Sequence, residues 1–170
     1  MNDGLRKLNE AGRETAESVF RDCCGSRRWA ELVAGSRPFT SEEDLLQKAT
    51  AIWNDLNESD WLEAFGAHPK IGESKAASHQ QKRSAGWSKG EQAGVSTATD
   101  ETRDELVEVN RLYEQKFGFI FIVCATGKGA DEMLQLCRQR LGNTPADEFR
   151  IAAEEQRKIT EIRLRKLLDQ

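Results

Sequence analysis

The chain has 170 residues, 29 acidic against 25 basic side chains and a formal net charge of -4, which suits one ordinary domain over residues 1–170. This acidic balance, and the lack of a sustained Lys/Arg face, argue against a surface that binds nucleic acid. No apolar run approaches the ~18 residues that cross a bilayer, and the amino terminus lacks the apolar stretch of a signal peptide. The sequence therefore predicts a cytoplasmic protein with neither nucleic acid nor membrane as a partner.

Strong helix formers dominate the chain, and it has only three prolines. This composition predicts an all-α, single-domain compact bundle of about eight helices. Apolar periodicity and terminal residues place helices, in chain order, over residues 12–24, 27–34, 41–56, 59–66, 100–117, 130–142 and 144–170. Ser41 followed by Asp44 is typical of a helix start, Gly118 is expected to stop the helix before it, and Pro145 suits a first helical position.

Three stretches break the helical pattern. Before Pro69 the α conformation is disfavoured, so a helix is expected to end at His68. Residues 74–94 are polar, and the pattern does not place their helices. Residues 117–125, FGFIFIVCA, are the most β-like in the chain, but a single strand has no partner for its backbone hydrogen bonds. This run is therefore either a buried helix or an extended apolar core segment whose backbone groups need other partners, of which a ligand could be one.

The four cysteines are Cys23, Cys24, Cys124 and Cys137. Neither the adjacent pair nor the separation of the last two matches the C-x-x-C spacing of zinc and redox sites. Only two histidines are available to complete a metal site. The sequence therefore predicts reduced thiols and no bound metal.

His68 is the first candidate for chemistry because it directly precedes a proline at a helix end, where a rigid backbone holds its imidazole. The ordinary histidine pKa of roughly 6.5 suits proton transfer near neutrality. The alternative is a capping or surface histidine. His79 lies in the polar stretch SHQQKR and is interpreted as solvated.

A second candidate is the stretch from Ser88 to Gln92, which offers a hydroxyl, a carboxylate and an amide within five residues. Such groups suit a polar heterocycle that carries both donors and acceptors. The alternative is structural, because Ser-x-x-Glu is also the capping box of a helix start, formed here by Ser88 and Glu91. The two interpretations are compatible if a cavity lies beside the cap.

Arg163 interrupts a mainly apolar stripe of the last predicted helix. The stripe follows steps of three and four residues through Phe149, Ala152, Gln156, Ile159, Arg163 and Leu167. A buried guanidinium requires an anion, either an internal carboxylate such as Glu91 or the carboxylate of a substrate. The alternative is an arginine at the edge of the stripe, with its charged end in solvent.

Three motifs, taken together, resemble a known family. They are AHPKIG at 67–72, SKGEQAG at 88–94 and FGFIFIVCATGK at 117–128, and they are similar to the signature segments of the 2-oxo-4-hydroxy-4-carboxy-5-ureidoimidazoline (OHCU) decarboxylases of uric acid degradation. RPF at 37–39 and IRLRKLL at 162–168 are also similar. The likeness spans nearly the whole chain.

The resemblance implies an all-helical domain, usually a homodimer, that decarboxylates OHCU to (S)-allantoin without metal or organic cofactor. Such an enzyme is a lyase of purine metabolism. The family's principal catalytic histidine falls on His68, with Glu91 as its acidic partner and Arg163 as the arginine that lines the site. An alternative is a helical binding module for a related ureide or purine metabolite. The presence of both His68 and Glu91 weighs against that alternative.

The resemblance also implies two sets of substrate contacts. The first set is Pro69, Ser88, Lys89, Gly90, Glu91 and Gln92. The second is a segment whose backbone binds the substrate, formed by Phe121, Ile122, Val123, Cys124 and Ala125.

Overall fold

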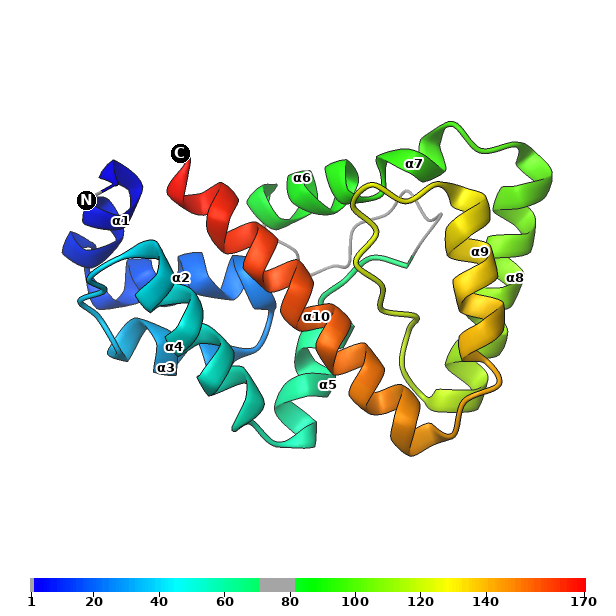
Figure 1. Ribbon diagram of the computed structural model, residues 1–170, viewed down its shortest axis with the longest axis horizontal. Helices are drawn as coiled ribbons and strands as arrows, with labels where there is room; N and C mark the ends of the chain where they lie inside the picture. The colour runs from blue at the N-terminus through cyan, green and yellow to red at the C-terminus, as the bar shows by residue number, and fades with distance from the viewer. Residues whose placement is uncertain (1, 71–81) are drawn as a thin grey trace. The chain divides into compact units, whose positions relative to one another are not determined.

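The computed structural model of the chain describes residues 2–70 and 82–170, and this part contains ten α-helices and no strand (Figure 1). The all-α prediction is confirmed, with two helices more than expected. In chain order the helices are α1 (Asp3–Glu10), α2 (Arg13–Cys24), α3 (Arg27–Gly35), α4 (Glu42–Asn54), α5 (Glu58–Gly66), α6 (Lys82–Glu91), α7 (Ala93–Ser96), α8 (Asp100–Phe117), α9 (Ala130–Arg140) and α10 (Pro145–Leu168). No described helix is both long and apolar enough to span a membrane. The predictions for Ile71, Gly72 and His79 lie outside the described residues.

The chain forms two compact units, one of residues 1–64 with 157–170 and one of residues 65–156. Helix α10 contributes its first half to the second unit and its last turns to the first. The single domain over residues 1–170 stays a prediction.

In the first unit, α3 packs against both α2 and α4 (Figure 1). Trp29 of α3 is fully buried, its ring meets Phe20 edge-on at 6.1 Å, and its indole Nε1 donates to the Ala49 carbonyl at 3.0 Å. The predicted start of α4 is confirmed, because Ser41 Oγ accepts from Asp44 N at 3.0 Å. These contacts join three short helices around one tryptophan.

Helix α1 was not expected from the sequence. It presents only two buried apolar side chains, Leu5 and Leu8, and its first turn is capped by the side chain of Asn2. It lies so close to the end of α10 that a Cβ on Gly4 would be 2.2 Å from the Leu168 carbonyl oxygen. A tertiary contact, more than helical periodicity, therefore fixes this helix.

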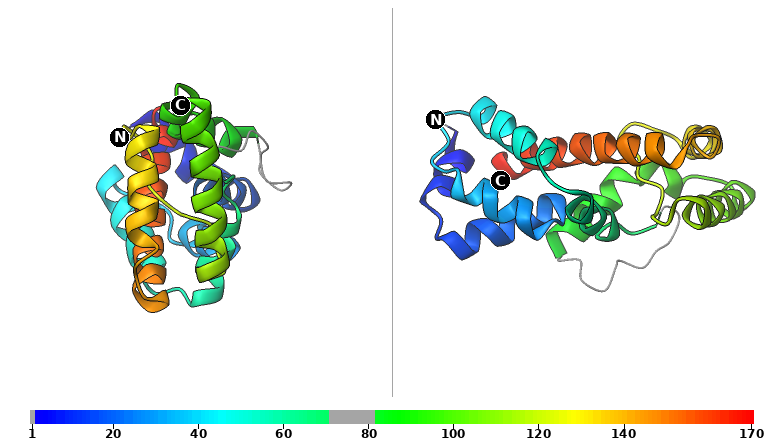
Figure 2. Two further views of the ribbon diagram at one scale, coloured as in Figure 1. Left: turned by 90° about the vertical axis from the view of Figure 1, so that its right-hand side faces the viewer. Right: turned by 90° about the horizontal axis from the view of Figure 1, so that it is seen from below.

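In the second unit, α8 and α9 lie side by side and run parallel (Figure 2, left). Near their starts, Thr102 Oγ1 donates to Asp131 Oδ1 at 3.3 Å, and at their ends Lys116 Nζ donates to the Asn143 carbonyl at 3.0 Å. A parallel pair requires a connection that returns along the helices. Helix α8 has 18 residues and is ~27 Å long, whereas the twelve residues 118–129 would cover only ~18 Å as a helix. The connection must therefore be extended.

The connection is the β-like run of the sequence. Residues 120–125 form neither helix, strand nor turn, and Phe121 to Ala125 are all buried. The Tyr113 ring of α8 packs against Phe117 at 4.7 Å and against Phe121 at 5.3 Å. Of the two alternatives for this run, the extended core segment is correct. Gly118, with φ +80°, ends α8 as predicted.

Side chains supply the hydrogen bonds that a neighbouring strand would otherwise provide. Arg140 Nη1 donates to the Ile122 carbonyl at 2.7 Å, Glu155 Oε2 accepts from Cys124 N at 2.7 Å, and Lys128 Nζ donates to the Cys124 carbonyl at 2.9 Å. Buried backbone groups without partners are costly, so these contacts stabilise the extended conformation. They come from α9, from α10 and from the turn that follows the segment.

Arg140 is itself held by a buried carboxylate. Glu148 of α10 is fully buried and accepts from Arg140 Nε at 2.6 Å, from the Tyr113 hydroxyl at 2.5 Å and from Asn143 Nδ2 at 2.9 Å. Burial and the hydrogen bond to Glu148 raise the pKa of Tyr113 well above its usual range, so the phenol stays a donor. The three contacts tie α8, α9 and α10 together beside the segment.

Gly94 of the second motif approaches the end of the segment. A Cβ at Gly94 would lie 2.2 Å from the Lys128 carbonyl oxygen, whereas a Cβ at Gly86 in α6 would meet nothing within 4 Å. Because the obstructing atom is backbone, only glycine lets α7 lie against this turn.

We expect Gly94→Ala to lower the free energy of unfolding by about 1–3 kcal/mol, because the new methyl group forces the backbone apart. The matched control Gly86→Ala should raise it by about 0.5–1 kcal/mol, since alanine is the better helix former. Urea unfolding of both variants measures the difference. Equal effects at the two glycines would contradict the close approach.

Glu155→Leu should destabilise the fold by about 1–3 kcal/mol, because the buried Cys124 N–H loses its acceptor. Hydrogen exchange of the Cys124 amide should accelerate in this variant. The neighbouring, exposed Glu154 provides the control, and Glu154→Leu should change stability by less than about 0.5 kcal/mol. A Cys124 amide that exchanges equally in both variants would show that Glu155 does not hold the segment.

Candidate active site

His68 follows the end of α5 at Gly66, two residues beyond the last helical residue, so the predicted helix end at His68 is wrong by two residues. The chain leaves the helix through a tight turn in which His68 N donates to the Phe65 carbonyl at 3.3 Å. The Phe65 ring packs against Phe119 at 5.3 Å and against Phe149 at 5.8 Å. An aromatic cluster thus fixes the backbone three residues before the histidine.

The imidazole of His68 is half-buried and contacts α10. Its Nε2 lies 2.6 Å from Oε1 of Gln156, a residue that is 0 % exposed. An amide oxygen accepts hydrogen bonds, so this contact is a hydrogen bond when Nε2 carries the ring hydrogen. His68 is thus attached to α10 by one contact and is not fully solvated.

Ser88 and Glu91 lie in the last turn of α6 and are both buried. The capping-box interpretation is wrong because α6 begins at Lys82, six residues before the serine. Lys89 and Gly90, between them, are exposed, and Gln92 at the start of α7 is half-buried. Helical spacing thus places the hydroxyl and the carboxylate inward and the two residues between them outward.

Glu91 and the extended segment come together around Cys124. Burial raises the pKa of the Cys124 thiol, and the negative charges of Glu155 and Glu91 raise it further, while Lys128 opposes them. Glu155 also binds the Cys124 N–H, and the next residue on α10, Gln156, contacts His68. The structure therefore groups residues from all three sequence motifs around one turn of α10.

This arrangement combines an oriented imidazole with the buried carboxylate of Glu91, the half-buried carboxylate of Glu155, the ammonium group of Lys128 and an extended stretch of backbone. In an extended chain, the backbone groups of residues 122 and 124 point to one side and those of residue 123 to the other. Side chains bind Ile122 and Cys124, whereas among the described residues the Val123 backbone makes no hydrogen bond. Such a site suits proton transfer to a small polar molecule that carries both donors and acceptors.

Arg163 belongs to the first unit. It is 3 % exposed, and its Nη1 donates to the Cys23 carbonyl at 3.5 Å. Burial raises the pKa of the nearby Cys24 thiol to about 12, and the positive charge of Arg163 opposes this rise. The interpretation of Arg163 as an edge residue with its charge in solvent is wrong. Its place beside His68 and Glu91 stays a prediction.

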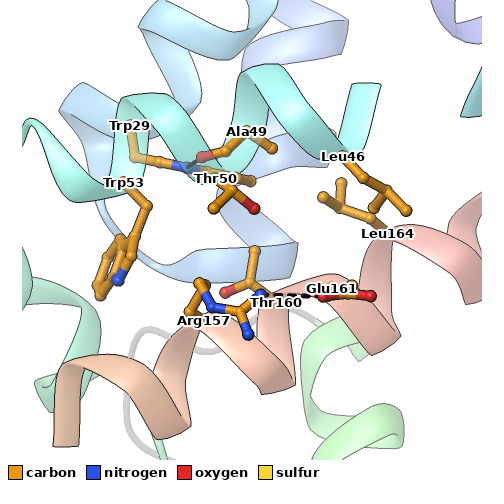
Figure 3. A pocket seen from close by; sticks show the side chains of 9 residues that line it. All are labelled: Trp29, Leu46, Ala49, Thr50, Trp53, Arg157, Thr160, Glu161 and Leu164. Atoms are coloured by element: carbon orange, nitrogen blue, oxygen red, sulfur yellow. Dashed lines mark hydrogen bonds and ion pairs between the residues drawn. The ribbon is translucent and has the colours of Figure 1, made fainter. Parts of the chain in front are cut away.

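The first unit also contains a small cavity between α3, α4 and α10 (Figure 3). Its walls include Trp53, Thr50 and the ion pair of Arg157 with Glu161 at 3.0 Å. The volume of about 10 Å³ is room for at most one water molecule. This cavity is too small for a metabolite.

All four cysteines are buried thiols that form no disulfide, as the sequence predicts. Within residues 2–70 and 82–170, no three His, Cys, Asp or Glu side chains are grouped so that they could hold a metal ion.

Two residues of the arrangement, Glu155 and Gln156, were not among the sequence candidates. Gln156 does lie on the stripe that singled out Arg163, and it interrupts the apolar pattern in the same way. A buried amide needs a partner just as a buried guanidinium does. That signal identifies Gln156 as a candidate, whereas nothing in the periodicity distinguishes Glu155 from its exposed neighbour.

Comparison with known proteins gives consistent matches. The family model described as OHCU decarboxylase matches residues 9–165. The chain is 40 % identical over 154 residues to the uric acid degradation bifunctional protein TTL of Arabidopsis thaliana, covering 91 % of this chain and 48 % of that protein. It is 31 % identical over 143 residues to the 2-oxo-4-hydroxy-4-carboxy-5-ureidoimidazoline decarboxylase of Amia calva, covering 82 % and 79 % of the two chains. The chain spans about a third to a half of the length of the bifunctional relatives it matches.

A solved structure, that of an OHCU decarboxylase in the presence of (S)-allantoin, matches with a TM-score of 0.78 and 38 % identity. The match covers 94 % of this chain and 100 % of that one. Fold, sequence and the three motifs around His68, Glu91 and Cys124 agree, and the chain belongs to the OHCU decarboxylase family.

Proposed function

We propose that this chain decarboxylates OHCU to (S)-allantoin in uric acid degradation. Family membership supports this activity, as does the likeness to a structure solved in the presence of (S)-allantoin. The observation that carries the proposal is the half-buried imidazole of His68, held at 2.6 Å by a fully buried amide in the same unit as Glu91 and the extended segment.

The reaction asks little of the protein. The bond from C4 of OHCU to its carboxylate breaks, CO2 leaves, and the electron pair passes into the neighbouring C=N of the ring. The ring nitrogen takes up a proton, the C4 hydroxyl loses one as it becomes the carbonyl of allantoin, and C5, which carries the ureido group, takes up a proton. Delivery of that last proton to one face of C5 sets the S configuration. Because the substrate supplies its own electron sink, we propose that the enzyme uses no metal or organic cofactor.

The proposed reaction assigns a role to each group of the site. His68 exchanges a proton with the C4 hydroxyl or with the reacting carbon, and Glu91 is the acidic group that favours its charged form. The Val123 N–H and C=O bind polar groups of the substrate, since the segment presents them on the side opposite Glu155. Arg163 binds the carboxylate that departs, for which its planar fork of donors is suited.

The same proposal includes a homodimer, which the family resemblance implies, and the cytoplasmic location that the sequence predicts. A binding module that only holds a related ureide is the competing function. The two functions differ in whether the chain changes the optical activity of the product, because OHCU also decays unassisted to racemic allantoin.

The direct test adds the chain to urate oxidase and hydroxyisourate hydrolase and follows the circular dichroism of the allantoin formed. We expect a growing signal of the S enantiomer with the chain present and none without it. Racemic product in both reactions would refute the decarboxylase and leave the binding module.

In this assay we expect His68→Asn to lower kcat by at least about 10²-fold, because asparagine keeps a hydrogen-bonding group but does not titrate near neutrality. Thermal unfolding should show that the variant is folded. A kcat above about a tenth of the wild-type value would remove His68 from the chemistry.

Arg163→Lys keeps the charge but loses the bidentate fork, so kcat/KM for OHCU should fall. Allantoin lacks the departing carboxylate, and its affinity as a competitive binder should stay unchanged. Equal losses for both molecules would place the guanidinium at the ring or the ureido group, and no loss for either would exclude Arg163 from the site. Arg163→Met tests an internal ion pair instead, which predicts destabilisation by roughly 3–5 kcal/mol.

A further inference from the structure

We infer that Gln156 is a positioning residue that fixes the tautomer of His68, so that Nδ1 is the nitrogen that accepts the proton. The role of Gln156 in catalysis rests on the proposed function, whereas the tautomer of His68 rests on the geometry alone. It assigns Gln156 a role in the activity without contact with the substrate.

Burial of the amide is the first support. Gln156 is 0 % exposed, and an amide removed from water is costly unless its polar atoms find partners. Its Oε1 lies 2.6 Å from His68 Nε2. Burial therefore favours a hydrogen bond to the amide oxygen of Gln156. His68 Nε2 can make that bond only by donating its hydrogen.

The second support is the anchoring of this part of α10. The residue before Gln156 is Glu155, which binds the Cys124 N–H at 2.7 Å. One turn of a helix thus holds both the ring of His68 and the backbone of the extended segment. Proton delivery to one face of C5 requires a fixed orientation of the ring relative to that backbone.

The third support is that an amide acceptor carries no charge. A carboxylate at this place would stabilise the imidazolium and raise the pKa of His68. An amide acceptor orients the ring without adding a further negative charge beside it. Charged groups on the elements around this contact, in the described part of this unit, include Glu91 on α6, Glu155 and Lys128 at Cys124, and Lys70, which pairs with Glu114 of α8 at 2.8 Å.

Nitrogen NMR of the histidine rings tests the tautomer without reference to activity. The chain has only two histidines, so His79→Asn assigns the signals. Above the pKa of the ring, we expect a pyrrole-type Nε2 and a pyridine-type Nδ1 for His68. A pyridine-type Nε2 would overturn the inference, because the ring would then accept from the amide nitrogen of Gln156.

Kinetics of two variants test the consequence. Gln156→Met keeps the volume but removes the acceptor, and we expect kcat to fall at least about tenfold while KM changes by less than about twofold. Gln156→Glu restores an acceptor with a charge, so the pKa of His68 and the acid limb of the pH–rate profile should both move to higher pH. Gln135→Met, at an exposed position of α9, is the control and should leave kcat unchanged.

The outcomes separate this inference from the proposed function. Wild-type protein that forms no (S)-allantoin refutes the function, while the ring signals still decide the tautomer. Wild-type activity with an unchanged kcat in folded Gln156→Met overturns the positioning role. If Gln156→Met does not fold, two other measurements decide. A pyridine-type Nε2 in the wild-type protein, or an acid limb of Gln156→Glu that does not move to higher pH, overturns the inference.

Discussion

The lone extended segment between α8 and α9 depends on side chains for its backbone hydrogen bonds. Parallel helices require a connection that returns along their length, and no strand lies beside this one in the described chain. Arg140, Glu155 and Lys128 supply the missing partners for Ile122 and Cys124. Because these partners bind only alternate residues, the Val123 backbone remains available on the other side. The constraint that stabilises the fold thus also determines which backbone groups of the segment are already bound within the protein.

Helix α10 connects this segment to His68. Three neighbouring residues of α10 make these contacts. Glu155 lies seven residues, about two helical turns, after Glu148, and Gln156 follows it directly. Glu148 holds the arginine that binds Ile122, Glu155 holds Cys124, and Gln156 holds His68. Ring orientation and backbone orientation are thus set by one rigid element. A reaction whose substrate carries its own electron sink needs this precise placement of a few groups more than it needs many groups.

Periodicity predicted most of the helices because their apolar faces repeat at the helical spacing, and Gly118 and Pro145 marked their ends. It missed α1, which only two buried leucines and a close contact with Leu168 hold in place. The capping interpretation of Ser88 and Glu91 was wrong because a local pattern does not say which end of a helix it occupies. Motif resemblance named His68, Glu91 and the segment. Gln156 interrupts the apolar stripe of the last helix, and that signal identifies it as a candidate. The contact of Glu155 is set by long-range packing, which no short sequence pattern encodes.

The proposed function requires a segment that is preformed in the free protein. Its Cys124 backbone is bound within the protein, and its Val123 backbone is expected to bind the ligand. Amide hydrogen exchange of these two residues, with and without (S)-allantoin, tests it most directly. We expect the Cys124 amide to be protected from exchange in the free protein and to stay equally protected when allantoin binds. The Val123 amide should become protected from exchange only when allantoin is present. A Cys124 amide that exchanges freely without ligand, or a Val123 amide indifferent to allantoin, would contradict it.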